Sequence, residues 1–192
     1  MKRQTEMPRL EQMESELKRV KYKRRYRSVL RSTVYALITV AAAAVLVATL
    51  WMPVLQIYGA SMSPTLEEGE IILSLKTGQF APGDIVAFYY NNKILIKRVI
   101  AGPGQWVNIT EDGSVYVDDR LLEEPYLHEK ALGECDIELP YQVPDERYFL
   151  MGDNRDVSID SRSTAVGCVA ADQVVGRVVF RIWPLSDFGP VR

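Results

Sequence analysis

The longest uncharged stretch of the chain constrains its fold more than any other feature. Residues 32–66 contain no Asp, Glu, Lys or Arg, and within them Thr33–Met52 are almost entirely apolar. As an α-helix, such a run of twenty residues rises about 30 Å, which matches the hydrocarbon thickness of a bilayer. Tyr35 and Trp51 lie near its ends, where aromatic rings favour the membrane interface. The sequence therefore predicts one transmembrane helix over residues 32–53.

The charges on the two sides of this run differ in sign. Residues 1–31 hold eleven Lys/Arg and four Asp/Glu, whereas residues 32–192 hold twelve Lys/Arg and twenty-one Asp/Glu. A basic head on an acidic body suggests nucleic acid or a membrane as partner, and the adjoining apolar run favours the lipid bilayer. We expect no nucleic-acid partner.

The positive charges also predict an orientation, because Lys and Arg accumulate on the cytoplasmic side of membrane segments. Residues 1–31 are then a basic, helical cytoplasmic segment, and residues 54–192 an extracytoplasmic domain. A cleavable leader is the competing interpretation, but its basic and apolar parts would both be unusually long. A single-pass protein of a plasma membrane is the resulting expectation.

The outer part of the chain has the texture of β-structure. Seven segments rich in Val, Ile, Tyr and Phe are separated by turn signals such as Pro82-Gly83-Asp84 and Gly102-Pro103-Gly104. The predicted strands are 70–75, 85–90, 94–101, 106–109, 114–117, 148–151 and 174–183. We predict an all-β or mainly β domain, with a more irregular cap region at about residues 118–146.

Metal and thiol chemistry have little support in the sequence. Cys135 and Cys168 are the only cysteines, and an extracytoplasmic domain permits a disulfide between them without requiring it. There is no CxxC pair and no His/Cys cluster. The prediction is no metal and no cofactor. His128, the only histidine, lies in a polar, loop-like context that favours a solvated side chain over a catalytic base.

A lysine is the better candidate for a base. Lys97 lies in an apolar strand and shares its predicted face with Leu95 and Val99. Burial without a counter-charge lowers a lysine pKa and yields a neutral amine, although a simple ion pair with a carboxylate is an equally good interpretation of the spacing. Ser61, in a Ser/Gly/Pro turn just after the membrane segment, is a candidate nucleophile.

Three segments taken together resemble the conserved boxes of bacterial type I signal peptidases, in order and spacing. They are Gly59-Ala60-Ser61-Met62-Ser63-Pro64-Thr65-Leu66, Ile96-Lys97-Arg98-Val99-Ile100, and Gly152-Asp153-Asn154-Arg155 followed by Ser158-Ile159-Asp160-Ser161-Arg162. The resemblance covers about residues 33–185 and is closest to the compact Gram-positive form with one anchor. It implies a signal-peptidase-like antiparallel β catalytic domain in a bacterial plasma membrane.

The resemblance also implies roles for individual residues. Ser61 would be the nucleophile and Lys97 the general base, while Ser158 would orient the lysine amine. The Ser61 N–H would help to stabilise the oxyanion. Some family members carry a serine where this chain has Gly59, so the second oxyanion donor here would be backbone or water, or would be lacking.

The remaining implied residues form two sets. Arg98, Asp153, Asp160 and Arg162 would be structural ion-pair residues. Small residues of the substrate, in an Ala-x-Ala-like pattern, would enter pockets lined by Ile57, Met62, Leu66, Leu95 and Ile96. The partners would be signal-peptide-bearing preproteins, the lipid bilayer and nearby export machinery. A self-cleaving serine–lysine peptidase and a non-catalytic anchored β-domain that binds exported chains are the alternatives.

Overall fold

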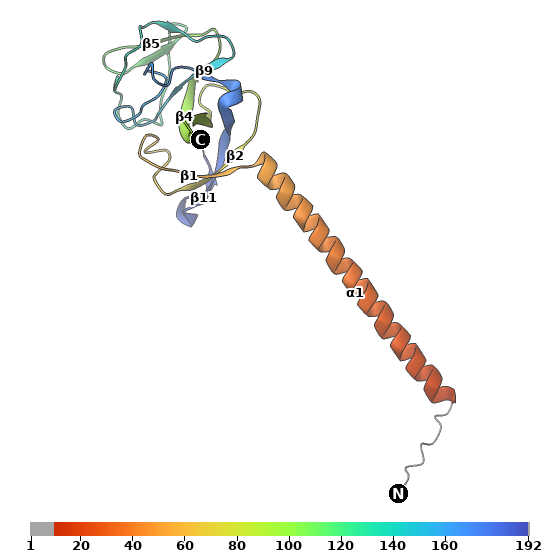
Figure 1. The fold of residues 1–192 in the computed structure, drawn as a ribbon. Coiled ribbons are helices and arrows are strands. Elements are labelled where there is room, and N and C mark those ends of the chain that lie inside the picture. Colours follow the sequence, from red (N-terminus) through yellow and green to blue (C-terminus); the bar gives the residue numbers. More distant parts are fainter. Residues whose placement is uncertain (1–9, 192) are drawn as a thin grey trace. The chain divides into compact units, whose positions relative to one another are not determined.

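The computed structural model describes residues 10–191, which divide into two units, one ending at Ala48 and the other beginning at Thr49. The first unit is part of a single helix, α1 (Leu10–Trp51), of 42 residues (Figure 1). The sequence predicts a cytoplasmic helix and a membrane helix, and the structure joins the two without a break. The reason is that no Gly or Pro occurs between residues 10 and 51. Residues 1–9 of the predicted basic segment lie outside the described residues.

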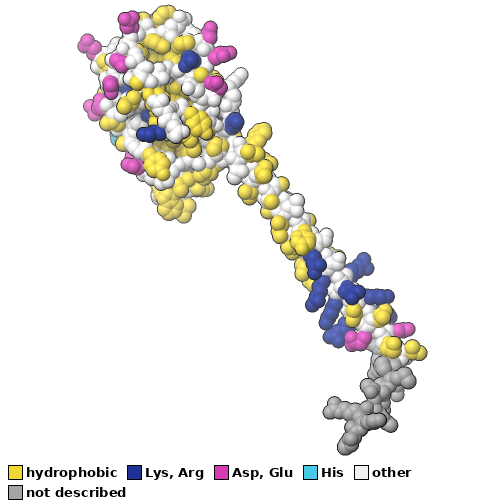
Figure 2. All heavy atoms as spheres, in the orientation of Figure 1, with side chains coloured by type: hydrophobic (Ala, Val, Ile, Leu, Met, Phe, Trp, Pro, Cys, Tyr) yellow, Lys and Arg dark blue, Asp and Glu magenta, His cyan; other side chains and the backbone are white. Residues whose placement is uncertain are grey.

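The helix α1 has the length and composition of a membrane span over Met13–Trp51, and no other helix of the described part qualifies. Figure 2 shows Lys and Arg side chains gathered over its N-terminal half and apolar side chains over the rest. Thr33 and Thr39 donate their hydroxyls to the carbonyls of Val29 and Tyr35, four residues earlier. These hydroxyls are satisfied within the helix, without water.

The second unit contains two antiparallel sheets. The larger sheet has the strand order β1-β2-β11-β3-β4-β9-β10, with β12 paired to β11. Its strands are β1 (Val54–Gln56), β2 (Ile71–Leu75), β3 (Ile85–Tyr90), β4 (Lys93–Ala101), β9 (Arg147–Met151), β10 (Val169–Ala170), β11 (Val174–Trp183) and β12 (Gly189–Pro190). The smaller sheet, in the order β7-β6-β5-β8, contains β5 (Trp106–Ile109), β6 (Val115–Val117), β7 (Arg120–Leu121) and β8 (Tyr141–Gln142). Two short 3₁₀ helices, η1 (Ala171–Gln173) and η2 (Leu185–Asp187), flank β11.

The prediction of a mainly β domain is confirmed, and each of the seven predicted segments contains a strand. The five additional strands, β1, β7, β8, β10 and β12, have only two or three residues each. Such short strands carry no periodic pattern because two residues cannot show an alternation.

Three apolar clusters stabilise this unit. One lies around the smaller sheet and contains Val107, Val115 and Phe149. A second packs Val86, Phe88 and Val99 of strands β3 and β4 against Leu150. The third joins the chain on both sides of Ser61 to the large sheet and contains Ile57, Met62, Leu66, Ile72, Ile85 and Val178. This third cluster fixes the segment that carries the candidate nucleophile.

Candidate active site

The central contact of the site joins two segments that are 36 residues apart. Lys97 lies on β4, opposite Val86 of β3, and Ser61 lies in the turn between β1 and β2. The Lys97 Nζ donates a hydrogen bond of 2.6 Å to Ser61 Oγ. Nucleophilic catalysis by serine uses a general base within hydrogen-bond distance of the hydroxyl, and a neutral amine can be such a base.

The backbone around Ser61 is held on both sides. Before it, Ile57 N–H bonds to the Glu70 carbonyl, and after it, Leu66 N–H bonds to the Met62 carbonyl, each at 2.9 Å. The Asn154 N–H reaches the Ser61 carbonyl itself at 3.1 Å. A hydrogen bond therefore joins the segment that carries Ser61 to the loop 152–162, which is distant from it in the sequence.

The environment of Lys97 lowers the pKa of its amine. Its side chain is buried, and burial lowers the lysine pKa from 10.5 to about 8. The charge of Asp160 acts in the opposite direction and Arg162 lowers the pKa further, whereas Asp153 raises it. The acids beside Lys97 are themselves paired with arginines, so that desolvation dominates. At pH 7 about one lysine in ten is then a free base, compared with fewer than about one in a thousand for a solvated lysine.

Ser158 lies in the same buried neighbourhood but bonds to a different partner from the one that the sequence suggests. Its hydroxyl donates to Asp160 Oδ2 at 2.7 Å. A hydroxyl that donates in this way keeps its lone pairs available to an amine. Gly152 lies close to Ser158 and to the backbone of Ser61. A Cβ at this position would lie 2.2 Å from Ser158 Oγ and 2.5 Å from the Ser61 carbonyl oxygen. Only glycine allows this close approach.

The four expected ion-pair residues form two buried pairs. Arg98 contacts both carboxylate oxygens of Asp153, at 2.9 and 2.7 Å, and Arg162 contacts Asp160 at 2.9 Å. Burial alone would raise the pKa of Asp160, but bonds from Arg162, the Gly152 N–H and Ser158 outweigh it and lower this pKa. These bonds thus favour the ionised form of Asp160, and Arg98 supplies the counter-charge of Asp153.

A third buried pair was missed by the sequence analysis. Arg155 binds Glu124, and both side chains are almost completely inaccessible. Glu124 belongs to the irregular cap region, where neither apolar alternation nor a motif distinguishes it from the neighbouring Glu123. Its position in the site depends on tertiary contacts, for which the sequence offers no local signal.

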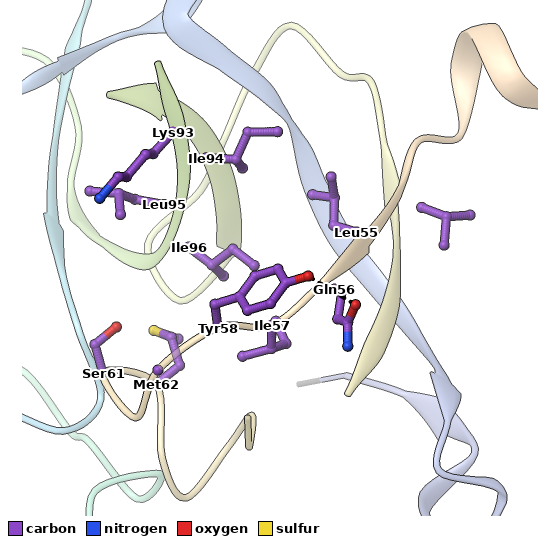
Figure 3. A pocket seen from close by; sticks show the side chains of 12 residues that line it. Leu55, Gln56, Ile57, Tyr58, Ser61, Met62, Lys93, Ile94, Leu95 and Ile96 are labelled. Atoms are coloured by element: carbon purple, nitrogen blue, oxygen red, sulfur yellow. Dashed lines mark hydrogen bonds between the residues drawn. The ribbon is translucent and has the colours of Figure 1, made fainter. Parts of the chain in front are cut away.

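An open groove of about 810 Å³ leads away from Ser61. Two chain segments form its walls, residues 54–62 on one side and 93–96 on the other (Figure 3). Four of the five residues predicted to select the substrate line it: Ile57, Met62, Leu95 and Ile96. Leu66 is not among the residues that line the groove; it is fully buried in the same apolar cluster as Ile57 and Met62, and its role stays a prediction.

Gly59 lines the same groove and has a φ angle of +82°. A Cβ on this glycine would meet no atom within 4 Å. The space beside Gly59 is thus open, and its left-handed backbone conformation favours glycine.

The remaining polar candidates lie apart from the Ser61–Lys97 pair. His128 is exposed and lines a separate cavity of about 260 Å³ together with Glu129 and Asp156. Cys135 and Cys168 are both free, which answers the question of their pairing in this structure, and burial raises the pKa of the Cys168 thiol to about 11. Within residues 10–191, no group of three or more His, Cys, Asp or Glu side chains is placed to hold a metal ion.

Known proteins have sequences similar to that of this chain. The family model described as signal peptidase, peptidase S26, matches residues 30–183. The chain is similar to signal peptidase IB of Staphylococcus aureus, with 39% identity over 152 residues, which are 69% of this chain and 78% of that protein. Signal peptidase I of Bacillus licheniformis is 35% identical over 164 residues, or 79% of this chain and 87% of the relative. A crystal structure of a signal peptidase I from Enterococcus faecalis covers 52% of this chain and 96% of its own, with 29% identity and a TM-score of 0.42. From the family match and the identities of these relatives, the chain belongs to the signal peptidase family, peptidase S26.

Proposed function

We propose that this chain is a membrane-anchored endopeptidase that removes N-terminal signal peptides from secreted preproteins by means of a serine–lysine dyad. Membership of the signal peptidase family supports signal-peptide removal. The observation that carries the mechanism is the hydrogen bond of 2.6 Å between Ser61 Oγ and the buried amine of Lys97.

The proposed reaction is an acyl transfer in two steps. In the active form Lys97 is neutral, so that the hydrogen bond reverses and the Ser61 hydroxyl donates to the amine. As Ser61 Oγ attacks the scissile carbonyl, Lys97 takes the serine proton and then delivers it to the leaving amine of the mature protein. The acyl-enzyme that remains is attacked by water, with Lys97 again as the base, and the signal peptide leaves with a free carboxylate.

The oxyanion that forms during each step requires hydrogen-bond donors. We assign the Ser61 N–H to this role, and the open space at Gly59 accommodates a water molecule as a second donor. One such donor typically contributes about 2.7–4 kcal/mol of transition-state stabilisation. Ser158 is proposed to orient the Lys97 amine through its unused lone pairs.

The groove between residues 54–62 and 93–96 suits an extended substrate. Both walls contain strand residues, and an extended peptide can bond to strand edges while alternate side chains enter pockets. Ile57, Met62, Leu95 and Ile96 would limit these pockets to small residues, which corresponds to an Ala-x-Ala-like cleavage site.

The helix α1 provides the proposed anchor, with the N-terminus in the cytoplasm and residues 54–192 outside. This orientation is supported by the Lys and Arg that precede the apolar run. Ser61 follows Trp51, the last residue of the helix, by only ten residues, which span at most about 35 Å. Tethering of this kind raises the effective concentration of the enzyme at cleavage sites that emerge from the bilayer.

The direct test is incubation of the full chain, reconstituted in lipid vesicles, with a preprotein that carries a leader. We expect one cut at the leader junction, identified by mass spectrometry of both products, and no cut with Ser61→Ala. Cleavage of the chain itself alone would favour a self-cleaving peptidase. Binding of the preprotein without cleavage by the wild type would favour a non-catalytic domain.

The lysine base predicts the pH dependence of the reaction. Since only the neutral amine is active and the Lys97 pKa is about 8, turnover at pH 6 should be about a hundredfold below the plateau and should level off above about pH 9. The measurement is kcat between pH 6 and 10 with a peptide substrate that has no titratable group in this range. A flat or acid-peaked profile would contradict the assignment of Lys97.

A further inference from the structure

The irregular segment between β7 and β8, residues 122–140, contacts all three arginines of the site. Glu124 binds Arg155, and the Tyr126 ring lies under Arg98 with the guanidinium carbon 3.9 Å from the ring centroid. The Leu132 carbonyl accepts a bond of 2.6 Å from Arg162. This segment therefore contacts Arg155, Arg98 and Arg162, the arginines of the three buried ion pairs.

The Glu124–Arg155 pair holds the backbone beside the nucleophile. The Arg155 Nε donates to the Gly152 carbonyl at 3.1 Å, while its terminal nitrogens bind Glu124. Gly152 and Asn154 are the residues that contact the Ser61 carbonyl. A buried guanidinium needs its counter-charge in place, and no other carboxylate bonds to Arg155 within the described residues.

The Tyr126 ring stacks against Arg98, the residue that follows Lys97. Arg98 follows Lys97 on β4, and its guanidinium lies between the Tyr126 ring and the Asp153 carboxylate. Asp153 also accepts a bond of 2.5 Å from Thr65, four residues after the nucleophile. A second bond, from the Tyr126 hydroxyl to Glu124 at 3.0 Å, links the two cap residues to each other.

We infer that Glu124 and Tyr126 are positioning residues for the Ser61–Lys97 pair, acting through Arg155 and Arg98. The inference rests on the proposed function, because it assigns a role in that same reaction. Within the part of the chain that the structure describes, the side-chain bonds and ring contacts of Glu124 and Tyr126 go to Arg155, to Arg98 and to each other, and none goes to Ser61 or Lys97. Glu124 fixes the backbone that holds Ser61, and Tyr126 keeps Arg98 on Asp153, so that the charge of this acid stays neutralised near the base.

The expected signature follows from the charges that act on Lys97, which are those of Asp160, Arg162 and Asp153, all in the loop 152–162. Arg98, the next residue after Lys97 on β4, is the ion-pair partner of Asp153. When Arg98 loses the stack on Tyr126 and moves off Asp153, the uncompensated carboxylate favours the charged amine. The pH midpoint of turnover then moves to higher pH. A role confined to folding would lower the amount of active enzyme and leave this midpoint unchanged.

The experiment compares Tyr126→Leu, Tyr126→Phe and Glu124→Gln in the full chain, with turnover of a leader-derived peptide measured per titrated active site. For Tyr126→Leu we expect kcat to fall by about 10–100-fold with little change in KM, because small displacements of reacting groups act on the chemical step. The pH midpoint should also rise. Tyr126→Phe keeps the ring over Arg98 and should retain the wild-type midpoint. Glu124→Gln should lower kcat as Tyr126→Leu does.

Two substitutions nearby are matched controls. Tyr116→Leu is the control for Tyr126→Leu, because Tyr116 is a half-buried tyrosine of β6. Glu123→Gln is the control for Glu124→Gln, because Glu123 is the exposed residue next to Glu124. Both should keep the wild-type kcat and midpoint. If Tyr126→Leu does not fold, Tyr126→Met fills a similar volume without a ring and replaces it.

Wild-type kcat and midpoint per active site in Tyr126→Leu and Glu124→Gln would overturn the inference. So would a loss of activity that is explained entirely by fewer titratable sites. A wild type that cleaves no leader-derived peptide would instead refute the proposed function, so the two failures are distinguishable.

Discussion

Replacement of Lys97 with methionine is expected to abolish turnover and, at the same time, to stabilise the fold at neutral pH. The loss of activity follows because Ser61 would keep its proton without a neighbouring base, and we expect kcat to fall by about a thousandfold or more. The gain in stability follows from the lysine pKa, which is about 8 in the folded state instead of 10.5.

The sign of this stability effect can be derived from proton binding. Between pH 8 and 10.5 the unfolded chain binds more protons at Lys97 than the folded chain does, so the free energy of unfolding rises with pH in this window. Below pH 8 both states are charged, and the buried ammonium destabilises the fold by about 3 kcal/mol. Lys97→Met removes this destabilisation at pH 7. Its free energy of unfolding should therefore exceed that of the wild type, and the excess should shrink as the pH approaches 10.5.

Denaturant unfolding of both proteins at pH 7 and pH 10.5, followed by tryptophan fluorescence, measures this effect. Lys76→Met is the matched control, because Lys76 is exposed and lies outside the site, and it should change neither activity nor the pH dependence of stability. An inactive Lys97→Met protein that is no more stable than wild type at pH 7 would show that the ammonium is not destabilising in the fold.

The second large effect is expected for Arg162→Met. The Arg162 side chain is completely buried and bonds to Asp160 and to the carbonyls of Leu132, Arg155 and Ser158. Its removal leaves the Asp160 carboxylate buried without a counter-charge, which typically destabilises a protein by about 3–5 kcal/mol. Because Arg162 lowers the Lys97 pKa and Asp160 raises it, the remaining active enzyme should require a higher pH.

Arg177→Met is the comparison for this variant. Arg177 also pairs with an acid, Asp84, but 41% of its side chain is exposed. Exposed pairs of this kind contribute at most about 1 kcal/mol. Thermal unfolding of both variants, together with the pH profile of turnover, measures the difference. Equal losses of stability in the two variants would contradict the assignment of Arg162 to a buried electrostatic network.

The β domain was predictable where its strands are long. Strands such as β3 and β11 combine branched and aromatic residues with flanking turn signals, and their boundaries agree with the sequence prediction. The single long helix was not anticipated as one element, because a change from basic to apolar residues indicates a membrane boundary and carries no information about a break in the helix. The absence of Gly and Pro from residues 10–51 was the better guide.

The site was predictable only in part, for a related reason. A resemblance over three boxes suggested Ser61, Lys97 and the four ion-pair residues, and the structure brings the first two within 2.6 Å. The cap residues Glu124 and Tyr126 lie outside these boxes. Their contacts are set by how the 122–140 segment packs across the loop 152–162, which is a long-range property. Leu66 does not line the groove, because an apolar residue near a groove can equally well face the core.

The position of β11 in the large sheet has a consequence for the timing of activity. Ser61 lies beside β1 and β2, and Lys97 lies on β4, yet β11 stands between β2 and β3 in the sheet. Since β11 follows β2, β3 and β4 in the sequence, the two halves of the sheet have no strand between them until residues 174–183 have been made. Pairing over such sequence distances is slow compared with local folding. We expect Ser61 and Lys97 to reach this geometry only after β11 has been made and has paired with both of its neighbours.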